Sequence, residues 1–192
     1  MASEALVAFA ARALTSLVED YRRIFDLVDE PELDDSLRRM SAGVVGYAMS
    51  PGDILPDAMG MLGHLDDAIL YRMLLARVRK HAPEVAAAQA ARNPDLWEPL
   101  ETDLAVVREF IGDDVFEWLY ERVADLPGLV HRGRPLADLD LDTEDSGWLR
   151  DELNESLVRV DIKPDAARRE ARKADTILPR LKRRMEASRR SK

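Results

Sequence analysis

Apolar side chains recur every three or four positions along most of this 192-residue chain, and this period constrains the fold more than any other feature. A period near 3.6 residues predicts amphipathic helices that each bury one face. Strand-like alternation is confined to one short stretch, 157–162. The sequence therefore predicts an all-α protein, a compact helical bundle with C-terminal helical extensions. The helical stripes cover residues 6–28, 37–47, 65–78, 96–111 and 115–123.

Proline and glycine divide this pattern into segments. Pro31 ends the first stripe, Asn93 and Pro94 stop a later one, and residues 127–135 carry two prolines and two glycines. Acidic residues crowd the stretch that follows. We therefore expect four regions: a helical core over 1–92, a helical hairpin packed on it over 93–126, an acidic loop over 127–145, and a short helix followed by a basic helical tail over 146–192.

The composition narrows the class of protein. Apolar residues make up 46% of the chain, which is enough to form a hydrophobic core without disulfide bonds. The chain contains no cysteine, which excludes disulfides and thiolate metal sites. Glu4 stands where a signal peptide needs positive charge. The sequence has no run of about 18 uncharged apolar residues of the kind that spans a bilayer. We expect a cytoplasmic protein without a membrane-spanning segment.

Charge is distributed unevenly along the chain, whose net charge is −9. From Lys163 onward there are 12 Lys and Arg against 4 Asp and Glu, whereas residues 1–162 carry 16 against 33. A basic tail on an acidic body predicts that the tail docks on its own body, on a protein partner or on a polyanion. The tail contains no aromatic residue for base stacking, so we expect no nucleic-acid partner.

Residues 50–67, SPGDILPDAMGMLGHLDD, interrupt the ordinary helical pattern. One interpretation is structural: Ser50 caps a helix, Pro51 occupies its first position, and Asp53 reaches back to the cap. In this interpretation Pro56 and Asp57 repeat the arrangement one turn later. Gly60 or Gly63 then ends a short helix. Asp66 and Asp67 open the next helix at the positive end of its dipole.

The alternative interpretation of the same segment is a cation site. Asp53 and Asp57 are four residues apart, so on one helix their carboxylates share a face and repel each other unless a cation lies between them. A turn at the glycines could return Asp66 and Asp67 to the same corner. Such oxygen ligands favour Mg²⁺, Mn²⁺ or Ca²⁺, and His64 would admit a borderline metal. No other cofactor is expected.

The spacing of these residues resembles the signature of the YkvA-like domain of unknown function. That pattern is a tyrosine, a short gap, Ser-Pro-x-Asp-hydrophobic-x-Pro-Asp, and then Gly-x-hydrophobic-Asp-Asp, over about residues 35–90. The resemblance implies a small bacterial helical domain without an assigned activity, whose members are often suspected of membrane association. Gly52, His64 and the basic residues of the following helix depart from that pattern and argue against membrane insertion here. The matching positions are Tyr47, Ser50, Pro51, Asp53, Pro56, Asp57, Gly63, Asp66 and Asp67.

Three hypotheses for function follow. The first is a non-catalytic interaction or scaffold module with an unidentified protein partner or with itself as partner. The second is a divalent-metal-dependent hydrolase that uses Asp53, Asp57, Asp66 and Asp67 as ligands, with one of them or His64 as base. The third is polyanion or membrane-surface binding through the basic tail. The sequence contains no phosphate-binding glycine loop and no serine nucleophile elbow, which argues against nucleotide hydrolysis and serine chemistry.

Overall fold

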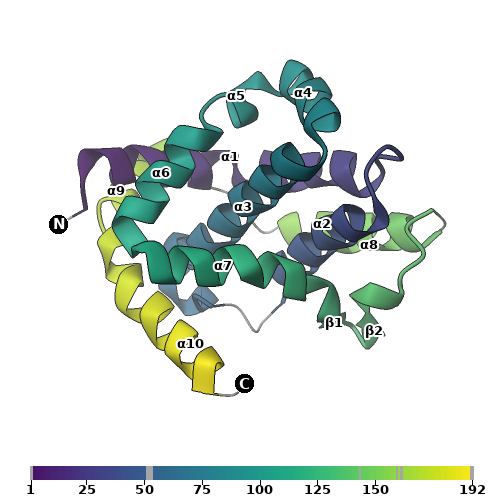
Figure 1. Ribbon diagram of the computed structural model, residues 1–192. Helices are drawn as coiled ribbons and strands as arrows, with labels where there is room; N and C mark the ends of the chain where they lie inside the picture. Colours follow the sequence, from purple (N-terminus) through teal and green to yellow (C-terminus); the bar gives the residue numbers. More distant parts are fainter. Residues whose placement is uncertain (1, 51–53, 143, 159, 161, 191–192) are drawn as a thin grey trace.

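Helices of the expected period account for most of the chain in the computed structural model (Figure 1). The structure describes residues 2–50, 54–142, 144–158, 160 and 162–190, and for Asp57 it describes the backbone alone. Within these residues the sheet structure is one two-stranded ribbon, so the predicted all-α class is confirmed.

The first two helices begin at side-chain caps. Helix α1 (Glu4–Val28) starts after Ser3, whose hydroxyl accepts a hydrogen bond from the Leu6 N–H. Helix α2 (Asp35–Ala48) starts after Asp34, whose carboxylate accepts from the Leu37 N–H at 2.8 Å. Such caps satisfy backbone donors that have no partner within the helix.

Helix α3 (Leu65–His81) lies at the centre of the molecule (Figure 1). Every residue from 65 to 75 is buried, because α1, α2, α6 (Leu100–Ile111) and α7 (Asp113–Asp125) all pack against it. A helix buried on all sides must also bury its polar residues, and in α3 these are Asp66, Asp67 and Arg72. A short 3₁₀ segment, η1 (Asp57–His64), leads into α3.

Two short helices lie between α3 and α6. Helices α4 (Pro83–Arg92) and α5 (Pro94–Trp97) connect α3 to α6. Gly112, with φ of +81°, then turns the chain between α6 and α7. A positive φ of this kind favours glycine, which has no Cβ to clash with the backbone.

The segment between α7 and α8 packs against α2 and carries four buried leucines. It consists of η2 (Leu126–Gly128), the antiparallel strands β1 (Val130–His131) and β2 (Arg134–Pro135), and η3 (Leu136–Asp138). A Cβ on Gly43 of α2 would lie 2.7 Å from the Leu126 carbonyl carbon, and a Cβ on Gly46 would overlap a methyl group of Leu136. Both glycines therefore allow a close approach of this segment to α2.

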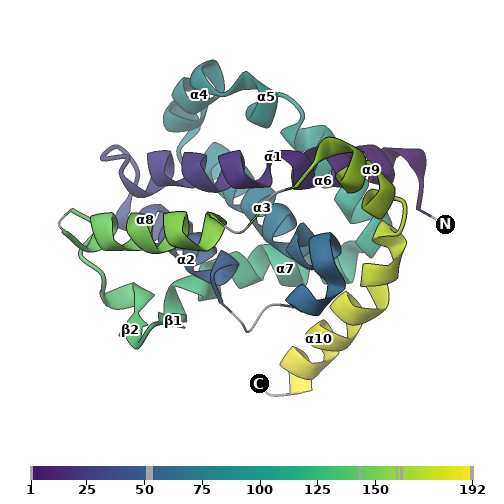
Figure 2. The ribbon, with the colours of Figure 1, turned by 180° about the vertical axis from the view of Figure 1, so that it is seen from behind.

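The C-terminal elements return across the helical core. Helix α8 (Glu144–Leu157) lies beside α1 and α2, as Figure 2 shows. Helix α9 (Pro164–Ala171) packs on α1, and η4 (Ala174–Ile177) connects it to α10 (Leu178–Arg190), which packs on α6 and α7 (Figure 2). Among the described residues, no helix has both the length and the apolar character needed to cross a membrane.

Candidate functional site

A buried hydrogen-bond network joins the end of α2 to the start of α3 through the signature residues Tyr47 and Asp66. The Tyr47 hydroxyl donates to Asp66 Oδ2 at 2.6 Å and accepts from the Ile54 N–H at 2.6 Å. Asp66 Oδ2 also accepts from the Leu55 N–H at 2.9 Å. These bonds tie the chain after residue 53 to two helices, and we call the four residues the Tyr47–Asp66 latch.

The latch is fully enclosed. Asp66 is 0% exposed, and burial raises the pKa of its carboxyl well above the usual range. The neighbouring Asp67 carboxylate raises that pKa further, while the hydrogen bonds from Tyr47 and Leu55 act in the opposite direction. Burial also raises the pKa of the Tyr47 phenol, which therefore remains a hydrogen-bond donor at neutral pH.

Asp67 and His64 form a second contact at the same helix start. The Asp67 carboxylate is buried, and its Oδ2 lies 3.4 Å from His64 Nδ1. The Oδ1 atoms of Asp66 and Asp67 have no hydrogen-bond partner among the described residues. Both acids lie in the first turn of α3, where the helix dipole favours negative charge.

Three other signature residues lie in the described chain near the latch, and Ser50 is bonded to Tyr47 through the backbone. The Ser50 N–H donates to the Tyr47 carbonyl at 2.9 Å, and the Pro56 carbonyl accepts from the Met59 N–H at 2.9 Å. Gly63 is buried. The left-handed backbone expected at one of two glycines occurs at Gly60, with φ of +63°.

Two of the predicted metal ligands lie outside the described side chains. Pro51 and Asp53 fall in the undescribed stretch 51–53, and the side chain of Asp57 is not described. The capping and cation interpretations of these three residues therefore remain predictions. Among the described residues, no group of three or more His, Cys, Asp or Glu side chains could hold a metal ion.

Sequence reasoning missed a second buried polar cluster, which joins α1, α3 and α6. Arg72 of α3 lies 2.9 Å from Asp20 of α1 and 3.8 Å from Asp103 of α6. Arg12 closes the cluster with an ion pair to Asp103. The Ser16 hydroxyl donates to Asp20 at 2.8 Å. The available signal was a charged residue on an apolar stripe: Asp20 follows Leu17 and precedes Ile24 at helical spacing.

The basic tail docks on the body through apolar contacts. Leu181 and Met185 of α10 are buried, and Ala167 and Ala171 of α9 are buried against α1. The described salt bridges include none that joins a cation of α10 to an acid of the body. The described contacts of the tail with the body are thus mainly apolar.

Comparison with known proteins places the latch within a matched family model. Residues 38–71 match the model described as protein of unknown function (DUF1232). The match covers most of α2 and the start of α3, and includes both Tyr47 and Asp66. Comparisons with curated proteins and with solved structures give no significant match. The matched segment is thus similar to a family of unknown function.

Proposed function

We propose that this protein is a non-catalytic helical interaction module that binds an acidic protein surface through α10. In this proposal residues 50–67 are a YkvA-like signature whose acids hold the fold. The observation that carries the proposal is the arrangement of α10: its apolar stripe is docked on the body, and its cations face solvent.

The burial of the signature acid supports a structural role. Asp66 is enclosed on all sides, and its Oδ2 already accepts two hydrogen bonds, from Tyr47 and from the backbone at Leu55. A catalytic carboxylate needs to reach substrate within hydrogen-bond distance. A structural role requires only that the Tyr47–Asp66 latch hold α2, α3 and the chain between them together, and the observed hydrogen bonds do this.

The surface of α10 supports an interaction role. Leu178, Leu181 and Met185 recur at helical spacing and turn inward. The cations of this helix are exposed, and the described salt bridges include none of Arg180, Lys182, Arg183, Arg189 and Arg190. The exposed cations are Arg180, Lys182, Arg183, Arg184, Arg189 and Arg190.

The negative charge of residues 1–162 restricts an acidic partner to the basic surface of α10. Residues 1–162 carry 33 Asp and Glu against 16 Lys and Arg, so an acidic partner is repelled by most of this molecule. A local basic surface on an acidic protein orients such a partner during its approach and makes association depend on salt. Many arginines of the body are already paired with acids, as Arg38 is with Asp142 at 2.7 Å and Arg23 with Asp95 at 2.9 Å.

Binding of poly-L-glutamate to the full chain tests this proposal. The double variant Lys182→Gln/Arg183→Gln should weaken binding by about 2- to 30-fold, because two exposed ion pairs contribute about 0.2–1 kcal/mol each. The matched control is Lys80→Gln/Arg92→Gln, which removes the same charge from exposed positions of α3 and α4 and should have a much smaller effect.

Two results would contradict the proposal. Equal weakening by both double variants would show that binding follows net charge and not α10. Tighter binding to duplex DNA or to anionic vesicles than to poly-L-glutamate, with the same dependence on Lys182 and Arg183, would replace the acidic protein partner by nucleic acid or by a membrane surface.

A second candidate function is divalent-metal chemistry at the start of α3. The observation in its favour is the pair of buried Oδ1 atoms of Asp66 and Asp67, which meet no hydrogen-bond donor among the described residues. His64 lies beside them, and Asp53 and Asp57 are the further ligands that the sequence predicts. Carboxylate oxygens are the preferred ligands of Mg²⁺, Mn²⁺ and Ca²⁺, and a bound ion could activate water for hydrolysis.

Thermal unfolding with added Mg²⁺, Mn²⁺, Ca²⁺ or Zn²⁺ tests this second candidate. Free ion at ten to a hundred times Kd should raise the free energy of unfolding by about 1.4 to 2.7 kcal/mol. The shift should be lost in Asp67→Asn. An unchanged melting temperature with all four ions at millimolar concentration would reject the metal site.

A further inference from the structure

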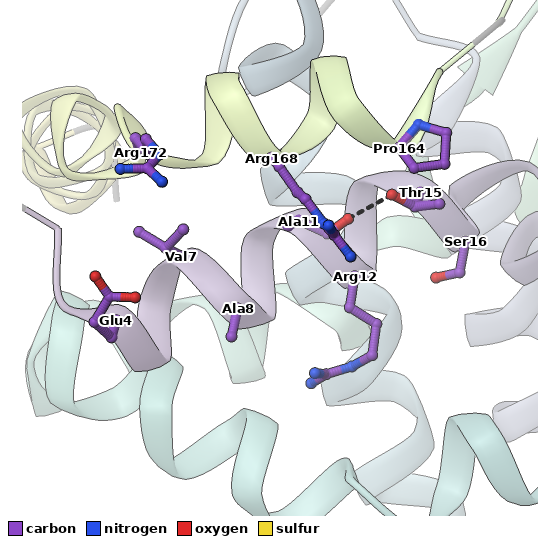
Figure 3. Close-up of a pocket in the computed structure, with 10 residues that line it drawn as sticks. All are labelled: Glu4, Val7, Ala8, Ala11, Arg12, Thr15, Ser16, Pro164, Arg168 and Arg172. Atoms are coloured by element: carbon purple, nitrogen blue, oxygen red, sulfur yellow. Dashed lines mark hydrogen bonds between the residues drawn. The ribbon is translucent and has the colours of Figure 1, made fainter.

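A pocket of about 570 Å³ lies between α1 and α9, and the residues that line it include none of α10 (Figure 3). Its volume falls in the range of about 300–1,000 Å³ typical of small-molecule sites. Helix α9 is held against α1 by Ala167 and Ala171, both 0% exposed, so one wall of the pocket is anchored to the other.

The α1 wall supplies an apolar floor. Val7, Ala8 and Ala11 lie on one side of the helix and line the pocket (Figure 3). Residues three and four positions apart are neighbours on a helix surface, so these three side chains form a continuous patch. Because two of them are alanines, the floor leaves room above it for an apolar group.

The α9 wall supplies positive charge. Arg168 and Arg172 are one helical turn apart, are exposed, and extend from α9 toward the α1 side of the pocket (Figure 3). Neither guanidinium forms a hydrogen bond or ion pair with any residue that the structure describes. Arg12 on the opposite wall differs, because it is paired with Asp103. Like charges one turn apart repel each other, and a bound anion would remove that repulsion.

We propose that this pocket binds a small phosphate monoester with an apolar body. A phosphate monoester carries between one and two negative charges at neutral pH, which matches the two unpaired arginines. The planar guanidinium fork binds phosphate oxygens through paired hydrogen bonds. The apolar body of the ligand then lies on Val7, Ala8 and Ala11.

Glu4 limits the kind of anion that fits. Its carboxylate lines the end of the pocket nearest the N-terminus of α1 (Figure 3). A single phosphate meets this repulsion beside two arginines that outweigh it, whereas a second anionic group on a longer ligand would add to the repulsion. The pocket therefore selects one anionic head joined to an uncharged body. This site is independent of the acidic protein partner proposed for α10.

Calorimetric titration of the full chain with hexyl phosphate tests the proposal. Hexyl phosphate should bind more tightly than inorganic phosphate, because only hexyl phosphate covers the apolar floor, and hexanol should not bind measurably. The double variant Arg168→Gln/Arg172→Gln should weaken binding by about tenfold or more, since hydrogen bonds to charged groups are the stronger kind. Lys182→Gln/Arg183→Gln removes the same charge from α10 and should leave the affinity for hexyl phosphate unchanged within about twofold.

Two single variants test the pocket from its α1 wall. Ala8→Glu places a carboxylate at an exposed position on the floor and should abolish binding by occupying the arginines. Glu4→Gln removes the repulsive carboxylate and should tighten binding. Both positions are exposed on a long helix, and an unchanged circular dichroism spectrum would show that the fold is kept.

Three outcomes would overturn the site. One is equal affinity for hexyl phosphate in the wild type and in Arg168→Gln/Arg172→Gln. Another is equal affinity for hexyl phosphate and inorganic phosphate, which would leave no role for the apolar floor. The third is binding to vesicles that contain phosphatidic acid without binding to soluble hexyl phosphate, because the anion would then be recognised on a membrane surface and not in this pocket.

Discussion

Replacing Tyr47 with phenylalanine removes one oxygen atom and should cost far more than an ordinary conservative substitution. The hydroxyl donates to Asp66 Oδ2 and accepts from the Ile54 N–H, both at 2.6 Å, and Tyr47 is 2% exposed. Phenylalanine keeps the ring and its packing. The change therefore isolates the hydrogen bonds of the Tyr47–Asp66 latch.

The magnitude follows from the groups left without a partner. Ile54 is 7% exposed, so its N–H has little access to water once the hydroxyl is gone. Asp66 keeps only the bond from the Leu55 N–H on its Oδ2. A buried polar group left unsatisfied costs about 1–3 kcal/mol, so Tyr47→Phe should lower the free energy of unfolding by about 2–4 kcal/mol.

Urea denaturation followed by far-UV circular dichroism measures this loss. Tyr120→Phe is the matched control: its ring packs on Arg77, and no described hydrogen bond involves its hydroxyl. The control should change stability by no more than about 0.5 kcal/mol. Equal losses in the two variants, with equal m-values, would refute the argument that the latch holds α2, α3 and the chain after residue 53 together.

Four further substitutions test the packing and the buried charges. Gly43→Ala places a Cβ 2.7 Å from the Leu126 backbone and should lower the free energy of unfolding by about 1–3 kcal/mol. Gly147 lies in a helix with open space around it, so Gly147→Ala should raise the free energy of unfolding by up to about 1 kcal/mol. Chemical denaturation measures both changes. The pKa of Asp66 is raised in the folded state, so its contribution to stability is present below the unfolded pKa and is lost as pH rises through the folded pKa. Asp66→Asn should therefore flatten the fall in melting temperature with rising pH, and an unchanged slope would contradict this assignment. Arg72→Met removes the cation beside the buried Asp20 carboxylate, while Asp103 keeps its ion pair with Arg12, and should cost about 3–5 kcal/mol in equilibrium unfolding; a loss below about 1 kcal/mol would contradict a stabilising role for this ion pair.

The helices could be predicted because their signal is local. Apolar residues at helical spacing predicted buried stripes over 6–28, 37–47 and 65–78, and α1, α2 and α3 cover these ranges. The period of a helix depends only on backbone geometry, so a stripe identifies the element before its partners are known.

The partners of these elements could not be predicted. The segment that packs on Gly43 is the η2 turn at Leu126, more than eighty residues later in the chain. The buried cluster of Asp20, Arg72 and Asp103 draws one residue from each of three separate helices. The position of Asp20 on an apolar stripe indicates burial, but only the neighbouring helices show which charges are paired in the core.

The sequence marked residues 50–67 as unusual, but it did not indicate how the acids of this segment differ. It grouped Asp66 and Asp67 as equivalent acids at a helix start. The structure distinguishes them: Asp66 accepts bonds from Tyr47 and the Leu55 N–H, whereas Asp67 lies beside His64. The signature pattern contained Tyr47 but did not reveal that its hydroxyl joins the acid to the Ile54 backbone.

The sequence by itself determined the helical class, the position of the signature segment and the separation of an acidic body from a basic tail. These properties depend on residue type and spacing along the chain. The tertiary structure decided which charges are buried, that the tail docks through Leu181 and Met185, and that Arg168 and Arg172 face a pocket on α1. The physical reason is that burial and pairing depend on which helices meet, and residues distant in sequence decide that.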